Sequence, residues 1–204
     1  MLVIGLTGRS CAGKDRFADE FAALGIGVID VDGLGHGALA AQAVRVAEAF
    51  GPQVMAANGS IDRKVLGKIV FGDPSQLKRL EAISHPWMVN ECRRLIAEAK
   101  AAGEPAVVLN AALLYRMRLD MLCDAVVFIR VPFYTRYRRA KERDKVSWEA
   151  FRAREKAQAD INPDVFKGRI PVVVMGNDGD PALIHRQVME FCDTMNIRMS
   201  LPQG

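Results

Sequence analysis

Long apolar stretches are missing from the sequence. A helix that spans a membrane needs roughly 20 consecutive apolar residues, whereas the longest apolar runs here, such as residues 125–129, have only the length of a strand. The first residues also lack the basic lead and the extended apolar core of a secretory signal, and a glycine-containing loop follows them directly. We therefore expect a cytoplasmic protein without a membrane partner.

Cysteine is scarce and never closely paired. The four cysteines include no Cys-x-x-Cys spacing, which argues against a zinc site and against a disulfide framework, so we expect free thiols. Stretches rich in Pro, Gly or Ser that would act as linkers are absent too. The composition, 50% hydrophobic and 25% charged, is typical of a globular chain, and the length favours one core that carries insertions.

Aromatic residues make up only 7% of the chain, and the net charge is only +4. The basic residues are nevertheless concentrated between positions 130 and 154. Because no aromatic stacking platform of the kind that binds single strands accompanies them, we expect no nucleic-acid partner. Such a basic cluster needs either an anionic ligand or a solvent-facing helix, and the pattern alone leaves both interpretations open.

Five apolar runs of strand length alternate with segments of helical period. The runs are continuous in Val, Ile and Leu, as expected for parallel strands that are covered on both faces. They lie at residues 2–6, 27–29, 106–109, 125–131 and 171–175. The sequence therefore predicts an α/β fold, a five-stranded and doubly wound parallel sheet with helices on both faces.

Two long excursions interrupt this alternation. The first separates the second and third strands, is far longer than an ordinary crossover and has a helical pattern, notably over 74–102. The second carries the basic cluster, and we interpret it as a lid. We therefore predict a single unit, residues 1–204, with a frayed tail over 200–204. Its parts are a core of 1–32, 104–132 and 170–200, an inserted helical region of 33–103 and a lid of 133–165.

A phosphate-binding loop follows the first strand. Residues 8–14 read Gly-Arg-Ser-Cys-Ala-Gly-Lys, which fits G-x-x-x-x-G-K between a strand and a helix, the context that this motif requires. Glycines let backbone N–H groups converge on a phosphate, the helix N-terminus adds positive potential, and Lys14 reaches the β- and γ-phosphates. We therefore predict a nucleotide site whose contacts with ATP come from Gly8, Arg9, Ser10, Cys11, Ala12, Gly13, Lys14, Asp15 and Arg16.

One position departs from this motif. Asp15 stands where a Ser or Thr hydroxyl would bind Mg²⁺. A carboxylate is a good Mg²⁺ ligand, yet it adds negative charge beside the phosphate oxygens. Three outcomes stay open: Asp15 binds the metal directly, the metal is bound through water, or the loop has lost its original chemistry.

Two aspartates, Asp30 and Asp32, mark the end of the second strand. In open parallel sheets, ligands bind beyond the carboxyl ends of the strands. If the strand continues, both carboxylates lie on one side, where one of them could accept the proton of an attacking hydroxyl or help to hold the metal. Capping of the following helix or a turn is an equal alternative on these two residues alone.

The order of these motifs resembles that of the dephospho-coenzyme A kinase family over nearly the whole chain. Besides the loop and the aspartates, the resemblance rests on Leu24-Gly25-Ile26, Phe50-Gly51, Asn58-Gly59-Ser60-Ile61-Asp62-Arg63, Leu66, Val70-Phe71, Leu80-Glu81, His85-Pro86, Leu113-Leu114, Pro132, Arg139, Arg143, Arg154, Gln158 and Asn177-Asp178-Gly179. It implies a P-loop kinase fold and phosphoryl transfer from Mg-ATP to the ribose 3′-hydroxyl of dephospho-CoA, the last step of coenzyme A biosynthesis.

The resemblance also assigns roles to single residues. Catalytic roles go to Lys14, to Asp32 as the base, and to the lid residues Arg139 and Arg143. Asn177 and Gly179 are assigned to the adenine side, and Asp15 is the candidate metal ligand. The inserted region becomes the acceptor-binding region, and the acceptor contacts are assigned to Asp32, Asp62, Arg63, His85, Leu113, Leu114 and Arg116.

Several positions differ from the family's pattern. Residues 110–116 read Asn-Ala-Ala-Leu-Leu-Tyr-Arg, where the family often starts with an acidic residue, has a proline before the leucines and ends in glutamate. His36 and Arg136 replace an arginine and a glutamine. Two alternatives therefore stay open: a kinase for a different small phosphorylated or nucleoside-like acceptor, and a nucleotide-binding protein that has lost phosphoryl transfer. We expect a monomer or a small homo-oligomer.

Overall fold

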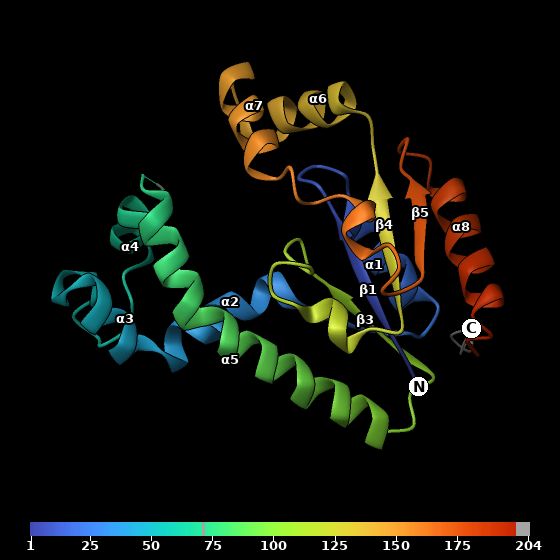
Figure 1. Cartoon of the computed structure of the whole chain (residues 1–204), viewed down its shortest axis with the longest axis horizontal. Helices are drawn as coiled ribbons and strands as arrows, with labels where there is room; N and C mark the ends of the chain where they lie inside the picture. The colour runs from blue at the N-terminus through green and yellow to red at the C-terminus, as the bar shows by residue number, and fades with distance from the viewer. Residues whose placement is uncertain (71, 199–204) are drawn as a thin grey trace. The chain divides into compact units, whose positions relative to one another are not determined.

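The computed structural model describes residues 1–70 and 72–198. Phe71 and the tail over 200–204, which the sequence predicts to be frayed, lie outside the described residues. The chain divides into two compact units (Figure 1), one formed by Met1–Asp30 with Leu95–Gly204 and the other by Val31–Arg94. The first unit contains the sheet, and the second is mainly helical.

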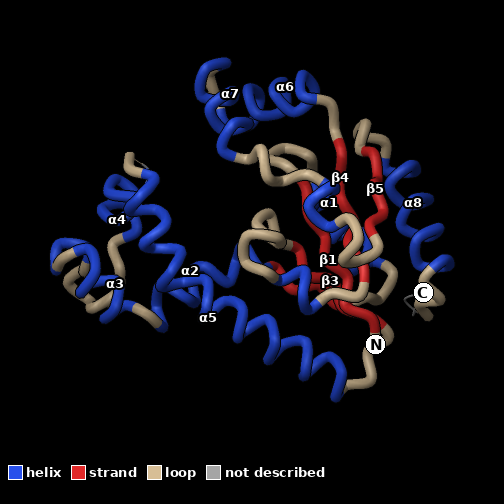
Figure 2. The backbone as a smooth tube through the Cα atoms, viewed as in Figure 1, coloured by secondary structure: helices blue, strands red, loops and turns tan. Residues whose placement is uncertain are grey.

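The first unit is built on a sheet, which is red in Figure 2. The sheet has five strands, and all neighbouring strands are parallel. The strand order is β2-β3-β1-β4-β5, and the strands are β1 (Leu2–Gly8), β2 (Gly27–Asp30), β3 (Ala106–Asn110), β4 (Ala125–Arg130) and β5 (Val172–Gly176). The five predicted strands and the α/β fold are thus confirmed. Because β1 is the central strand, the loop that follows it leaves the middle of the sheet at its carboxyl edge.

Helices α1 (Lys14–Ala23) and α8 (Pro181–Thr194) pack on one face of this sheet and share its largest apolar core. Phe21 of α1 meets Phe191 of α8 edge-on, with ring centroids 6.0 Å apart. On the opposite face, the segment that follows β3 lies so close to β1 that a Cβ on Gly5 would come within 2.6 Å of Leu114 Cδ2. Burial on both faces explains why the strands are continuously apolar.

Most of the range predicted as a lid consists of helices α6 (Phe133–Asp144) and α7 (Trp148–Ala157), followed by the 3₁₀ helix η3 (Pro163–Phe166). Aromatic rings hold the two helices together: Tyr137 of α6 lies 4.9 Å from Trp148 of α7 between ring centroids. The side chain of Ser147 caps α7 by accepting a hydrogen bond from the backbone N–H of Ala150. A 3₁₀ helix, η2 (Leu119–Leu122), precedes β4.

The second unit has its own apolar core, which includes Val46, Phe50, Val54 and Leu66. Its elements are α2 (Val31–Ala41), α3 (Ala43–Phe50), the 3₁₀ helix η1 (Pro52–Val54), α4 (Arg63–Val70) and α5 (Pro74–Ala101), whose last residues belong to the first unit. The long helix predicted over 74–102 is confirmed. Since β2 ends at Asp30 and α2 begins at Val31, the strand does not continue to Asp32, which instead lies in the first turn of a helix.

The four cysteines are free thiols, as the sequence predicts. Burial raises the pKa of Cys92 and of Cys192 to about 11, which makes both thiols unreactive at neutral pH. Among the helices of the described residues, none has the length and apolarity that crossing a bilayer requires.

Candidate functional site

The loop between β1 and α1 has a tightly turned backbone. Gly13 has a φ of 79°, and Cys11 has a φ of 61°, which is rare for a residue with a side chain. At the other end of the loop, a Cβ on Gly8 would lie only 2.8 Å from the carbonyl oxygen of Ile129. Alternation of ordinary and left-handed residues turns successive N–H groups to one side, which is the geometry of an anion-binding nest.

Asn177, which follows β5, supports this loop from behind. Its side-chain amide donates a hydrogen bond of 2.8 Å to the carbonyl of Ala12, and the residue is only 4% exposed. A Cβ on Gly13 would lie 2.4 Å from Asn177 Nδ2, so any larger residue at this position would require Asn177 or the loop to shift. Nearby, Arg16 donates a 3.0 Å hydrogen bond to the carbonyl of Gly179. The structure therefore brings Asn177 and Gly179 close to the phosphate loop. Asn177 stabilises the backbone of the loop through its hydrogen bond to Ala12.

Both lid arginines predicted to be catalytic lie at the same loop. Arg139 donates to the carbonyl of Asn177 at 3.0 Å and, more weakly, to that of Cys11 at 3.4 Å. Arg143 Nη2 lies 3.7 Å from Cys11 Sγ. A hydrogen bond to Asp144 raises the pKa of Arg143 above its ordinary value, so this guanidinium stays charged. The loop and α6 thus bring two guanidinium groups together, an arrangement that suits an anionic ligand.

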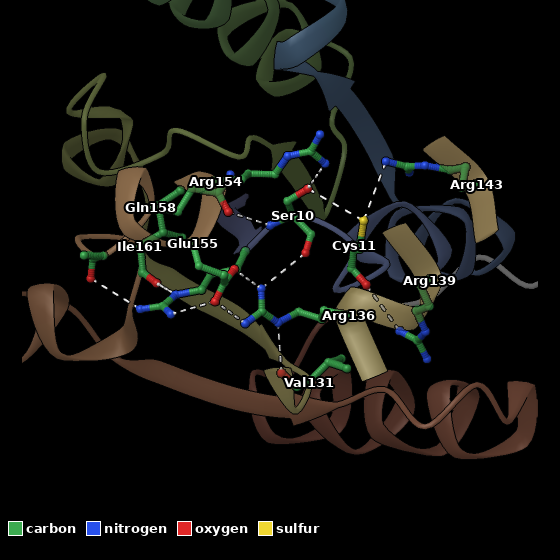
Figure 3. A network of polar contacts seen from close by, with 12 residues as sticks. Ser10, Cys11, Val131, Arg136, Arg139, Arg143, Arg154, Glu155, Gln158 and Ile161 are labelled. Atoms are coloured by element: carbon green, nitrogen blue, oxygen red, sulfur yellow. Dashed lines mark hydrogen bonds and ion pairs between the residues drawn. The ribbon is translucent and has the colours of Figure 1, made fainter. Parts of the chain in front are cut away.

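Glu155 of α7, a carboxylate whose side chain is 11% exposed, joins helices α6 and α7 to the start of the loop (Figure 3). It accepts hydrogen bonds from both Arg136 and Arg9, and the Arg136 side chain is only 5% exposed. Burial would raise the pKa of Glu155, but the two guanidinium groups outweigh burial and the pKa lies below its ordinary value. The sequence analysis missed Glu155, since nothing in its local pattern distinguishes it from other helical glutamates.

Further contacts fix the same part of the loop. The backbone N–H of Ser10 donates to Gln158 Oε1 at 2.9 Å, and Arg154 donates to the Ser10 hydroxyl at 3.3 Å (Figure 3). Arg9 Nε also donates to the carbonyl of Ile161 at 2.8 Å. The basic cluster therefore faces partly inward, onto Glu155 and the loop, and is only partly a solvated helix face.

Asp15, the departure from the loop motif, lies in the first turn of α1 with its side chain exposed. Its Oδ1 accepts a 3.0 Å hydrogen bond from Asn110 Nδ2 and forms a 3.2 Å ion pair with Lys14 Nζ. Loss of hydration beside the loop would raise the pKa of Asp15, but the amide of Asn110 and the charge of Lys14 hold it below the ordinary value. Asp15 is therefore a charged oxygen donor beside the loop at neutral pH.

The residues around Asp15 are suited to Mg²⁺. The oxygen of the buried Asn110 amide has no hydrogen-bond partner among the described residues. No three His, Cys, Asp or Glu side chains within those residues form a ready-made metal cage. Mg²⁺ needs no such cage, because proteins typically hold it through one or two carboxylates, waters and the phosphates of a nucleotide.

The stretch after β3 places its three predicted acceptor residues in different environments. Leu114 is fully buried against β1, whereas Leu113 lines a small pocket together with Thr7. Arg116 forms a close ion pair with Asp160 of the segment after α7, and this contact lowers the pKa of Asp160. The positive charge that departs from the family's pattern is thus matched by a carboxylate of the same unit.

The predicted acceptor residues of the second unit also differ in their surroundings. Asp62 caps α4, since its Oδ1 accepts from the backbone N–H groups of Lys64 and Val65 at 2.9 and 3.1 Å. Arg63 lines a pocket of about 340 Å³ between α2, α4 and α5, whose walls combine leucines and Val70 with polar side chains such as His36 and Glu81. His85 lies in α5 next to Pro86.

Comparison with known proteins decides what this arrangement belongs to. The model of the family described as dephospho-CoA kinase matches residues 2–180, which include the phosphate loop, both lid helices and the second unit. The chain belongs to the dephospho-CoA kinase family. Proteins named dephospho-CoA kinase from Geobacter sulfurreducens and Anaeromyxobacter dehalogenans are 36% and 37% identical to it, over 94% and 89% of this chain and 97% and 86% of their own.

Solved structures match the fold of this chain. A crystal structure of a protein from Thermus thermophilus matches 95% of this chain with a TM-score of 0.75 and 29% identity, and the match covers 97% of that protein. A dephospho-CoA kinase from Campylobacter jejuni matches 95% of this chain and 96% of its own with a TM-score of 0.63. At 23% identity the second match speaks for the fold alone.

Proposed function

We propose that the protein transfers the γ-phosphoryl group of ATP to the ribose 3′-hydroxyl of dephospho-CoA, the reaction that completes coenzyme A. One observation carries this proposal. The chain belongs to the dephospho-CoA kinase family, and it keeps the glycines and the lysine of the phosphate loop. Phosphoryl transfer needs little covalent chemistry from the protein, so positioning and charge stabilisation are the main tasks of the residues.

The loop and the lid helices supply most of the charge stabilisation. The N–H groups of the loop and the first turn of α1 bind the β- and γ-phosphates, and Lys14 adds a positive charge to them. Arg139 and Arg143, which lie at the loop, neutralise charge that develops on the transferred group. Asn177 supports this work by holding the loop's carbonyl at Ala12.

Mg²⁺ is the proposed metal, and when bound it screens the charge of the β- and γ-phosphates. Asp15 would hold it, with an unpaired amide oxygen of Asn110 nearby. Two residues beyond the end of β2, Asp32 is proposed to orient the acceptor hydroxyl and take its proton. Arg63 and His85 are proposed to contact the acceptor. The cytoplasmic location and the oligomeric state stay predictions of the sequence.

The test of this function is ADP release by the purified protein with Mg²⁺ and ATP, measured with and without dephospho-CoA. We expect release that depends on the acceptor, and a product whose added phosphate is on the 3′-oxygen by ³¹P and ¹H NMR. Release that is equal without the acceptor, or that occurs only with another alcohol, would refute the proposed substrate.

A second candidate function, nucleotide binding without transfer, is favoured by one observation, the carboxylate at position 15 next to the phosphate loop. This alternative predicts tight ADP binding and no turnover with dephospho-CoA. It further predicts that Asp15→Ser restores turnover if the carboxylate alone is responsible for its loss.

A further inference from the structure

Asp15 and Asn110, which are 95 positions apart in the sequence, form one polar contact beside the phosphate loop. Asp15 belongs to the first turn of α1, and Asn110 is the last residue of β3. Asn110 is only 5% exposed, although an amide at the end of a strand could easily reach water. A buried polar side chain at the carboxyl edge of the sheet therefore holds the carboxylate that replaces the hydroxyl of the loop motif.

The contact with Asp15 shows which way the Asn110 amide is turned. Its NH₂ group donates to Asp15 Oδ1 at 3.0 Å, so its oxygen is directed elsewhere. That oxygen, Asn110 Oδ1, is buried and has no hydrogen-bond partner among residues 1–70 and 72–198. A buried carbonyl oxygen without a donor is unfavourable, and it requires a cation or a bound water to satisfy it.

A second carboxylate follows the neighbouring strand on the same side of the sheet. Asp30, the last residue of β2, is the register partner of Asn110. Register partners of parallel strands direct their side chains to the same face, here the face of α1, because the preceding pair on that face, Val28 and Val108, packs into the core of α1. Asp15 and Asn110 thus place oxygen donors from two elements where the loop ends, with Asp30 at the neighbouring register position, and such donors suit Mg²⁺ or Mn²⁺.

We propose that Asn110 is a positioning residue for Asp15 and that this pair, rather than a hydroxyl of the loop, binds the divalent cation of the nucleotide. Asn110 holds Asp15 Oδ1, which leaves Asp15 Oδ2 for the cation, and the buried Asn110 Oδ1 receives a water of the cation's shell. The proposal rests on the proposed function only in assuming that a nucleotide with a divalent cation binds the loop.

The test uses Mn²⁺ as a paramagnetic probe with the full chain and saturating ADP, and free Mn²⁺ is measured by EPR. Asn110→Ala should weaken Mn²⁺ binding about tenfold, as loss of an outer-shell partner does. ADP affinity in EDTA and the unfolding midpoint should stay close to those of the native chain. Asn90→Ala, on an exposed turn of α5, is the matched control and should change none of these values.

A rescue variant keeps the test independent of any packing defect. Asp15→Ser alone removes the carboxylate and should weaken Mn²⁺ binding at least about tenfold, whereas Asp15→Ser with Asn110→Asp returns one carboxylate to the pair and should recover most of the affinity. Unchanged Mn²⁺ affinity in Asn110→Ala, or no recovery in the double variant, would overturn the proposal.

The readout also separates this proposal from the proposed function. Mn²⁺ and ADP binding are measured without any acceptor, so a chain that binds both normally but does not phosphorylate dephospho-CoA refutes the substrate and leaves the metal pair standing. A chain that turns over dephospho-CoA while Asn110→Ala keeps native Mn²⁺ affinity refutes the metal pair and leaves the substrate standing.

Discussion

At the scale of single residues, the conformation of the phosphate loop depends on residue 13 having no side chain. Gly13 has a left-handed backbone conformation, and the position that a Cβ would take lies against Asn177 Nδ2. Two separate costs therefore oppose any larger residue there. Gly103 has the same φ of 79° but open space around it, so the chain contains its own control for separating these costs.

We predict that Gly103→Ala lowers the free energy of unfolding by about 1–2 kcal/mol, the cost of a left-handed alanine. Gly13→Ala should lose roughly 2 kcal/mol more, because the new methyl group overpacks against Asn177. It should also weaken ATP binding, since the loop backbone must shift. Urea unfolding and calorimetric titration with ATP measure both quantities, and equal losses of stability in the two variants would contradict the proposed clash.

Asp32 carries the second prediction at this scale. Asp32→Asn keeps the size of the side chain but cannot take a proton, so turnover of dephospho-CoA should fall by about 10²–10⁴-fold, the range of general-base contributions. The dissociation constant for ATP should stay close to the native value. Single-turnover kinetics and ATP titration make the measurement, and native turnover would remove Asp32 from its proposed role.

The residue scale is also where the sequence was least informative. The loop motif could be recognised in the sequence because its residues are consecutive. The contact between Asp15 and Asn110 could not be predicted, since it depends on how β3 pairs with β1. Glu155 was missed for the same reason, because Arg136 and Arg9 become its neighbours only when α7 packs against α6 and the loop.

At the scale of elements, α7 is fastened to the loop by the pairing of Glu155 with Arg136 and Arg9. Removal of one partner leaves a buried charge without compensation. Strand and helix ranges, by contrast, followed from local pattern, since buried parallel strands are apolar throughout. Only the junction at Val31 differed, because helix formation begins one residue after β2 and leaves Asp32 in a helix instead of on a strand.

We predict that Glu155→Gln lowers the free energy of unfolding at pH 7 by about 3 kcal/mol, as the loss of a buried ion pair does. Glu149→Gln, on an exposed position of the same helix, should cost less than about 1 kcal/mol. Urea unfolding of both variants beside the native chain measures these values. Equally small losses of stability in the two variants would refute the proposed role of Glu155.

Comparison of the native chain with Glu155→Gln also predicts how the free energy of unfolding depends on pH. The folded pKa of Glu155 lies below its ordinary value, so the stability it contributes is present above the ordinary carboxyl range and is lost as the pH falls through the folded pKa. The difference in unfolding free energy between the native chain and Glu155→Gln should therefore be largest near neutral pH and shrink below about pH 4. A difference that grows on acidification would have the wrong sign.

At the scale of the whole molecule, the phosphate loop and the pocket beside Arg63 lie in different units. The phosphate loop and the lid helices belong to the first unit, while the pocket that Arg63 lines lies wholly in the second. If the second unit binds the acceptor, Arg63→Ala should raise KM for dephospho-CoA about tenfold, the loss of roughly one charge-assisted hydrogen bond. KM for ATP should stay unchanged.

Steady-state kinetics with each substrate varied in turn measures this split. Arg45→Ala, an exposed arginine of α3 in the same unit, is the control and should leave both constants at native values. A rise in KM for ATP in Arg63→Ala, or an equal rise in KM for dephospho-CoA in Arg45→Ala, would contradict the assignment of the acceptor to the pocket beside Arg63.

The central place of β1 has a consequence for the order in which the protein can be assembled during synthesis. Both of its partner strands come late in the chain, because β3 begins at Ala106 and β4 at Ala125. The second unit, by contrast, is one continuous segment with its own apolar core. On the ribosome, the strand that leads into the phosphate loop must wait unpaired until the segment up to Ala106 has emerged. This strand is thus translated well before both strands that pair with it.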